Sequence, residues 1–255
     1  VDLVAGLLLV CAIGVPYGVA FKLVVISGLV TMPLNAWALG RLARLPFPTP
    51  VLLAVATLPF VFDRSFNIYG GNIASTMAGE FAFSMGLSLS LLAIGASIRA
   101  LDTGEGRGWA ALALAVTGLC HLFPAFFALG VVCAYALVRF GRTQLRVLAA
   151  VLPVGGLLGA FWALPFFAKK TWMNDMGWGK VFQFKENLLT RNALPSTFLK
   201  DSPPLEVIFA LAVVGLVLSI WRRNRLGIAL AVSAAIVGYE FIHRPPGRLW
   251  NGRML

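Results

Sequence analysis

The residues of this sequence best suited to chemistry lie in a polar stretch, residues 63–80, between two apolar runs. It contains Asn72, Ser75, Thr76 and Glu80 together with three glycines. Small residues and glycines allow an irregular backbone and the close approach of a ligand. Asn72, Ser75 or Thr76 could each cap a following helix, whose positive dipole end favours a phosphate group. We therefore predict that Asn72, Ser75 and Thr76 bind phosphate or substrate.

Two further residues could transfer protons. Glu80 stands where the next apolar run begins, and a carboxylate in that position is costly unless it is paired or faces a wet cavity. His121 follows an apolar run, and imidazole exchanges a proton near neutral pH. We predict Glu80 and His121 as catalytic candidates. The alternatives are an ion pair between Glu80 and an arginine of another helix, and a hydrogen-bonded structural role for His121.

A third group of candidates lies near the end of the chain. Arg244, Arg248 and Arg253 follow an apolar run, and arginine makes two-pronged contacts with phosphate groups. We predict that these arginines bind a phosphate or diphosphate, with ordinary anchoring at a membrane surface as the alternative. The three cysteines show no metal-ligand spacing. We therefore predict no metal ligands and no evident cofactor, while a divalent metal ion stays open.

The composition indicates which elements must position these residues. Of the 255 residues, 59% are hydrophobic and only 12% are charged, and the mean hydropathy is +0.86. Soluble domains carry about 25% charged residues, and one core of this size cannot bury so much apolar surface. The sequence therefore predicts an all-α polytopic transmembrane bundle with the lipid bilayer as its partner. We attribute the net charge of +11 to arginines beside membrane helices rather than to a nucleic-acid partner.

The apolar runs predict eight or nine membrane helices, because a span needs about 20 apolar residues. Residues 109–138 form one long run with Pro124 near its middle, which suits two short helices that meet at residues 121–124. Other runs are short or contain proline. The predicted spans are residues 3–21, 23–40, 50–62, 81–98, 109–138, 147–168, 205–221 and 226–241.

Arginine placement predicts how the helices are oriented. Four short loops are rich in arginine, namely residues 41–50, 99–108, 139–146 and 222–225. The positive-inside rule places them in the cytoplasm. The alternation of spans then places outside the membrane residues 63–80, 121–124, 169–204 and the tail from residue 242. Residues 169–204 interleave aromatic residues with lysines, which suits an extracytoplasmic loop or a segment lying at the membrane surface.

Neither an internal repeat nor the boundary of a soluble domain is visible, so we expect residues 1–255 to form one polytopic domain. The chain opens on Val1 inside an apolar run and stops at Leu255 just after a polar string. We therefore expect it to be truncated at both ends.

Several segments resemble a known family. They are Met32–Arg41 (MPLNAWALGR), the Gly-Gly-Asn of residues 70–72, the AGEFAFS of residues 78–84, and the Leu-Cys-His-Leu of residues 119–122. Together they resemble the bacterial membrane proteins called 6-pyruvoyl-tetrahydropterin-synthase-related, which are similar to the YfhO-like proteins and to the GT-C glycosyltransferases. Cys120 stands where that family has a small polar residue.

The resemblance implies a glycosyltransferase of the bacterial cytoplasmic membrane that serves cell-envelope glycan synthesis. Its donor would be a polyprenyl-phosphate-linked sugar and its acceptor a glycan or lipid. Such enzymes carry a catalytic carboxylate in their first outer loop, and this chain has no matching loop. Glu80 and His121 are therefore carried over as candidates only, and no catalytic base is assigned. Two alternatives are a transporter or flippase for lipid or polyprenyl carriers, and a non-catalytic scaffold for envelope assembly.

Overall fold

The computed structural model describes residues 6, 10–12, 14–64, 70–172 and 203–243, and in this part of the chain all regular structure is helical. This confirms the all-α prediction. Three short elements are α4 (Ile73–Ser75), the π-helical turn Thr76–Glu80 and the 3-10 turn Lys170–Trp172. The longer helices are α2 (Tyr17–Leu42), α3 (Thr49–Val61), α5 (Phe81–Thr103), α6 (Arg107–Cys120), α7 (Leu122–Val138), α8 (Arg142–Ala168), α9 (Pro203–Trp221) and α10 (Arg225–His243).

Three of the described helical stretches are long and apolar enough to cross a membrane: Tyr17–Leu42, Ile73–Thr103 and Arg142–Ala168. The other apolar helices are shorter. At a rise of 1.5 Å per residue, α6 and α7 are roughly 21 and 26 Å long, less than the ~30 Å of a hydrocarbon core. The length criterion thus supports part of the predicted set of spans.

The predicted helix boundary at Lys22 is wrong. Helix α2 begins at Tyr17, directly after Pro16, and continues through Lys22 to Leu42. Proline has a fixed φ and no N–H group, so it is well suited to the beginning of a helix. Lysine is a good helix former, and the exposed Lys22 side chain costs the helix little. Lys22 interrupts the apolar run, but it does not interrupt the helix.

The predicted loop at residues 99–108 is also too long. Helix α5 continues to Thr103, so that Arg99 and Asp102 belong to its last two turns. Gly104 then takes a left-handed conformation with φ 76°, which is the usual way to end a helix with glycine. Only residues 104–106 connect α5 to α6.

The predicted division of residues 109–138 is confirmed. Helix α6 ends at Cys120 and α7 begins at Leu122, with only His121 between them. His121 is extended, with φ −159° and ψ 136°, and this single residue reverses the chain. Pro124 lies in the first turn of α7, where its missing N–H group breaks no helical hydrogen bond.

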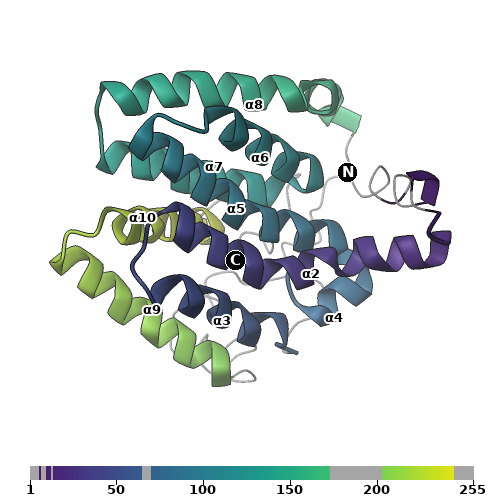
Figure 1. Cartoon of the computed structure of the whole chain (residues 1–255), viewed down its shortest axis with the longest axis horizontal. Helices are drawn as coiled ribbons and strands as arrows, with labels where there is room; N and C mark the ends of the chain where they lie inside the picture. Colours follow the sequence, from purple (N-terminus) through teal and green to yellow (C-terminus); the bar gives the residue numbers. More distant parts are fainter. Residues whose placement is uncertain (1–5, 7–9, 13, 65–69, 173–202, 244–255) are drawn as a thin grey trace.

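The helices run alternately between two ends of the bundle. Four connections, residues 43–48, 104–106, 139–141 and 222–224, lie toward the left of Figure 1, and we call this the arginine end. There Asp102 of α5 forms an ion pair with Arg139 and accepts a 2.9 Å hydrogen bond from the hydroxyl of Tyr135. The opposite end holds α4, the π-helical turn and His121, and we call it the junction end.

Helix α5 packs against α2, α6, α7 and α8 and lies at the centre of the bundle. Its most extensive contact is with α2. A Cβ atom on Gly28 would lie 2.4 Å from the backbone nitrogen of Met85, so glycine is required there. Nearby, the Ser88 hydroxyl lies 2.9 Å from the Thr31 hydroxyl and accepts a 2.8 Å hydrogen bond from the Asn35 amide. Small residues with hydrogen bonds across the contact are typical of helix pairs in membranes.

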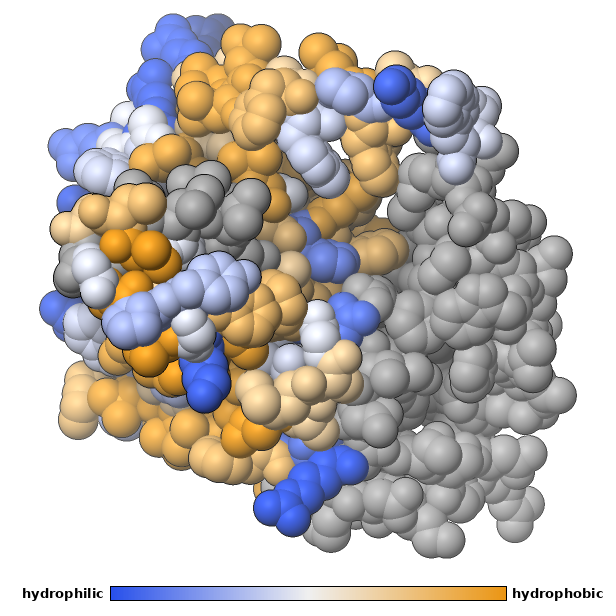
Figure 2. All heavy atoms as spheres, turned by 90° about the vertical axis from the view of Figure 1, so that its right-hand side faces the viewer, coloured by the Kyte–Doolittle hydropathy of each residue, from blue (hydrophilic) through white to orange (hydrophobic). Residues whose placement is uncertain are grey.

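The outer helices present large apolar side chains instead. Those exposed on α8 include Val154, Leu157, Leu158, Phe161, Leu164 and Phe167. Figure 2, which looks at the junction end, shows mostly hydrophobic residues with scattered hydrophilic ones in the described part of the surface. The exposed apolar side of α8 suits a hydrocarbon solvent better than water.

Candidate functional site

Asn72 organises the loop before α5. Its side-chain oxygen accepts a 2.8 Å hydrogen bond from the backbone N–H of Ser75, and its amide donates a 2.9 Å bond to the carbonyl oxygen of Asp63. Of the three predicted caps, Asn72 is therefore the one that begins the helical turns at residue 73. Asn72, Ser75 and Thr76 are all buried.

Ser84 fastens this loop to α5. Its hydroxyl lies 2.6 Å from the Thr76 hydroxyl and accepts a 3.0 Å bond from the backbone N–H of Gly71. Thr76 in turn donates a 2.7 Å bond to the carbonyl oxygen of Asn72. Ser84 was not among the residues predicted from the sequence. The available signal was a serine placed one helical turn after Glu80, on the side that meets the loop.

The two glycines at positions 70 and 71 have the irregular backbone that the sequence predicted. Their φ angles are 92° and 89°, which side chains other than glycine rarely adopt. A Cβ atom on Gly70 would lie 2.3 Å from the ring of Phe83, and one on Gly71 would lie 2.6 Å from the ring of Phe60. The loop therefore lies directly on these two aromatic rings.

The sequence predicts a helix that starts at residues 72–76 and continues into the next span. In the structure this helix is interrupted. Helix α4 has three residues, and the π-helical turn that follows contains Gly79 with φ 114°. A π-turn inside a long helix is often found at a functional site. Because of this kink, Glu80 immediately precedes α5, and a sustained helix dipole begins only at Phe81. The side chains of Asn72 and Thr76 are hydrogen-bonded within the protein, and their phosphate-binding role stays a prediction.

Glu80 follows a glycine that faces open space. Its side chain is partly exposed, and a Cβ atom added to the neighbouring Gly79 would meet no atom within 4 Å. A carboxylate at the first turn of a helix is stabilised by the helix dipole. The backbone carbonyl of Glu80 also accepts a 3.2 Å hydrogen bond from Ser84. The chain thus places this carboxylate at an accessible edge of the junction end.

His121 has a structural role. Its Nδ1 atom accepts a 3.3 Å hydrogen bond from the backbone N–H of Phe123 and so caps α7. A Cβ atom on Gly86 would lie 3.0 Å from the Cβ atom of His121, so a small residue on α5 makes room for the junction. The structural alternative considered for His121 is therefore present in the structure.

The structure brings Glu80 and His121 to the same end of α5. The ring of Phe83, three residues after Glu80, meets the imidazole of His121 edge to face at a centroid distance of 5.1 Å. One turn of α5 therefore separates Glu80 from the residue that touches His121. A carboxylate and an imidazole are therefore both found at the junction end.

The remaining candidates cannot be placed. Arg244, Arg248 and Arg253 lie outside the described residues, as does most of the predicted outer loop at residues 169–204. Among the residues that are described, no group of three or more His, Cys, Asp or Glu side chains could hold a metal ion. The phosphate-binding role of the three arginines therefore stays a prediction.

Comparisons with protein-family models, with curated proteins and with solved structures find no match for this chain.

Proposed function

We propose that this chain is a multi-pass protein of the bacterial cytoplasmic membrane that transfers a sugar from a polyprenyl-phosphate carrier to a glycan or lipid acceptor. The exposed apolar side chains of α8 and the small-residue contact between α2 and α5 support residence in a bilayer. The concentration of arginine at one end supports an orientation with the arginine end in the cytoplasm. The junction end then faces the outside, where lipid-linked sugars are used.

One observation carries the proposed chemistry: the kink at Gly79 sets the partly exposed Glu80 at the junction end, one turn from the aromatic contact with His121. Glu80 acts as the general base that takes the proton of the acceptor hydroxyl. The acceptor oxygen forms a bond to the anomeric carbon while the bond from that carbon to the phosphate oxygen breaks. The sugar moves to the acceptor and polyprenyl phosphate leaves.

Cationic groups are needed where the phosphate departs, because negative charge develops on its oxygen. In this proposal Arg244, Arg248 and Arg253, which follow α10 in the sequence, supply that charge. His121 supports the site as a second proton-transferring group. A divalent ion, if one is used, would be held by the phosphate and by carboxylates rather than by cysteines.

The test is turnover of radiolabelled polyprenyl-phosphate pentoses and hexoses by membranes that contain the chain. Glu80→Gln keeps the size and polarity of the side chain but cannot accept the proton, so we expect transfer to fall at least about 100-fold. Glu80→Asp retains a carboxylate and should keep measurable activity. Membrane insertion should be unchanged in both variants. Normal turnover by Glu80→Gln would show that Glu80 is not part of the site.

A lipid or polyprenyl-carrier flippase is the second candidate, because the interrupted helix at residues 76–80 is also a feature of transporters. It predicts carrier movement across vesicles without release of polyprenyl phosphate. A scaffold in envelope assembly predicts neither activity, and this outcome would reject both proposals.

A further inference from the structure

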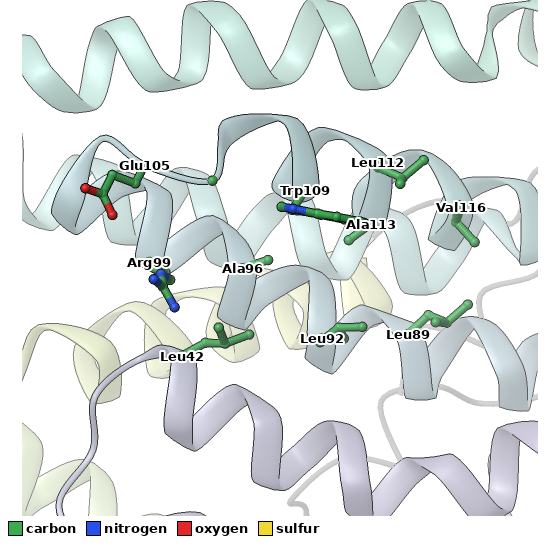
Figure 3. Close-up of a pocket in the computed structure, with 11 residues that line it drawn as sticks. Leu42, Leu89, Leu92, Ala96, Arg99, Glu105, Trp109, Leu112, Ala113 and Val116 are labelled. Carbon is green, nitrogen blue, oxygen red and sulfur yellow. The ribbon is translucent and has the colours of Figure 1, made fainter.

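A pocket at the arginine end lies away from the proposed catalytic site. It has a volume of about 640 Å³ and lies between α5, α6 and the end of α2 (Figure 3). This size falls within the range of ordinary ligand sites. Its lining is mainly aliphatic, and it includes Leu42, Leu89, Leu92, Trp109, Leu112 and Val116.

The charges in this pocket are gathered at one end. Figure 3 shows Arg99 and Glu105 together on one side, Trp109 in the middle, and aliphatic side chains beyond it. Arg99 and Glu105 are exposed, and they form no ion pair with each other. Both charges are therefore available to a ligand. A tryptophan between a polar and an apolar region is typical of a residue at a membrane interface.

The length of the apolar part matches one leaflet of a bilayer. Arg99 and Leu89 are ten residues apart on α5, a distance of about 15 Å along the helix axis. The hydrocarbon core of a bilayer is about 30 Å thick, so one leaflet is about half of that. The ligand should accordingly have a charged head and an apolar chain of leaflet length.

We infer that this pocket binds a phospholipid of the cytoplasmic leaflet whose headgroup contains both a phosphate and a primary amine. The Arg99 guanidinium contacts the phosphate, since arginine matches phosphate oxygens in charge and geometry. The Glu105 carboxylate accepts hydrogen bonds from the ammonium group, and an acyl chain lies along the aliphatic side chains toward Val116. This inference rests on the membrane location in the proposed function and not on its sugar-transfer chemistry.

The experiment uses quenching of tryptophan fluorescence by lipids with brominated acyl chains. The whole chain is placed in phosphatidylcholine vesicles, and brominated phosphatidylethanolamine, phosphatidylglycerol or phosphatidylcholine is titrated in. The chain has seven tryptophans, so the difference between the parent and Trp109→Phe isolates the signal of Trp109. We expect phosphatidylethanolamine to half-quench this signal at about a fivefold lower mole fraction than the other two lipids, the effect of one exposed ion pair.

Charge variants identify the contacts with the headgroup. Each variant is measured together with its Trp109→Phe derivative. Glu105→Gln should abolish the preference for phosphatidylethanolamine, whereas Arg99→Gln should weaken quenching by all three lipids, because each of them carries a phosphate. Arg146→Gln is the matched control, because Arg146 is exposed, lies near the same end of the bundle and does not line the pocket. Equal quenching by all three lipids would overturn the inference, and so would a preference for phosphatidylglycerol that survives Glu105→Gln.

Extraction of the membranes with sodium carbonate, performed first, separates the two proposals. A chain that washes out of the membrane contradicts both the membrane location and the lipid site. A chain that stays in the membrane but shows no lipid preference contradicts the lipid site alone.

Discussion

Helices α5 and α8 are both long and apolar, yet the protein uses them in opposite ways. In the most apolar 18-residue window of each helix, 61% of the residues are buried in the stretch that contains α5 and only 11% in α8. The buried helix carries serines and glycines, and four of its serines are buried: Ser84, Ser88, Ser90 and Ser97. Helix α8 carries leucine and phenylalanine on its exposed side.

Hydropathy therefore does not decide which helix is central in this bundle. In a bilayer, lipid tails solvate leucine as well as a protein interior does, so large apolar residues gain little from contact with other helices. Small residues allow close backbone contact, and serine hydroxyls find partners only inside the protein. Four substitutions test this difference.

The largest effect is expected from a charge placed on the exposed side of α8. Leu157 is 74% exposed near the middle of the helix, so Leu157→Arg puts a guanidinium at the centre of the bilayer, at a cost of about 3 kcal/mol. Membrane insertion should fall sharply in a glycosylation-mapping assay. Leu145→Arg is the control, because residue 145 is exposed near the arginine end, where the side chain reaches the interface. Equal insertion of both variants would show that α8 does not face lipid.

Overpacking the contact between α2 and α5 should come next. A side chain on Gly28 meets the backbone of Ser84 and Met85, which cannot move aside, and we expect Gly28→Leu to destabilise the protein by about 1–3 kcal/mol or more. The midpoint of thermal unfolding in detergent measures this loss. Gly156→Leu on α8 makes the same change in open space, and its midpoint should match the parent. A similar loss in both variants would argue against a special contact at Gly28.

Removing one hydroxyl from this contact should have a smaller effect. Ser88→Ala leaves Thr31 and Asn35 without their partner on α5, and a loss of about 1 kcal/mol is expected. Ser90→Ala removes an equally buried hydroxyl that bonds only to its own helix, at Leu87. The midpoint of thermal unfolding should be similar in the parent and in Ser90→Ala, and lower in Ser88→Ala. The reverse order would place the stabilising hydrogen bonds elsewhere.

The smallest effect is expected at the arginine end. Asp102 and Arg139 form a partly exposed ion pair, so Asp102→Asn should cost less than about 1 kcal/mol, and less still in high salt. The asparagine can still accept the hydrogen bond from Tyr135. A loss larger than that of Ser88→Ala would mean that the ends of the bundle, rather than its small-residue contact, hold it together.

Much of the fold could be predicted from apolar runs and their interruptions. The ends of α3 and α9 and the division at His121 follow from proline, glycine and polar residues that any reader of the sequence can find. Lys22 misled the prediction because a single charge interrupts apolarity without interrupting helical hydrogen bonds. The extension of α5 to Thr103 was missed for the same reason, since Arg99 and Asp102 are compatible with a helix end.

The site was predictable only in part. Asn72 as a cap and the irregular backbone at Gly70 and Gly71 follow from local residue preferences. The kink at Gly79 does not, because glycine in a helical run usually stays helical unless tertiary contacts fix another conformation. The contact of Ser84 with Thr76 and the meeting of Phe83 with His121 join residues whose proximity depends on the folded chain.

The single residue between α6 and α7 also constrains how the protein is made. Each of these helices is short, and His121 alone cannot span the distance that would let one helix enter the bilayer before the other. In the proposed membrane location, the two helices would therefore enter the bilayer together as one hairpin, whose tip would cross first. Lengthening the tip by a flexible insert would uncouple the pair and expose the polar backbone at the end of each helix to lipid.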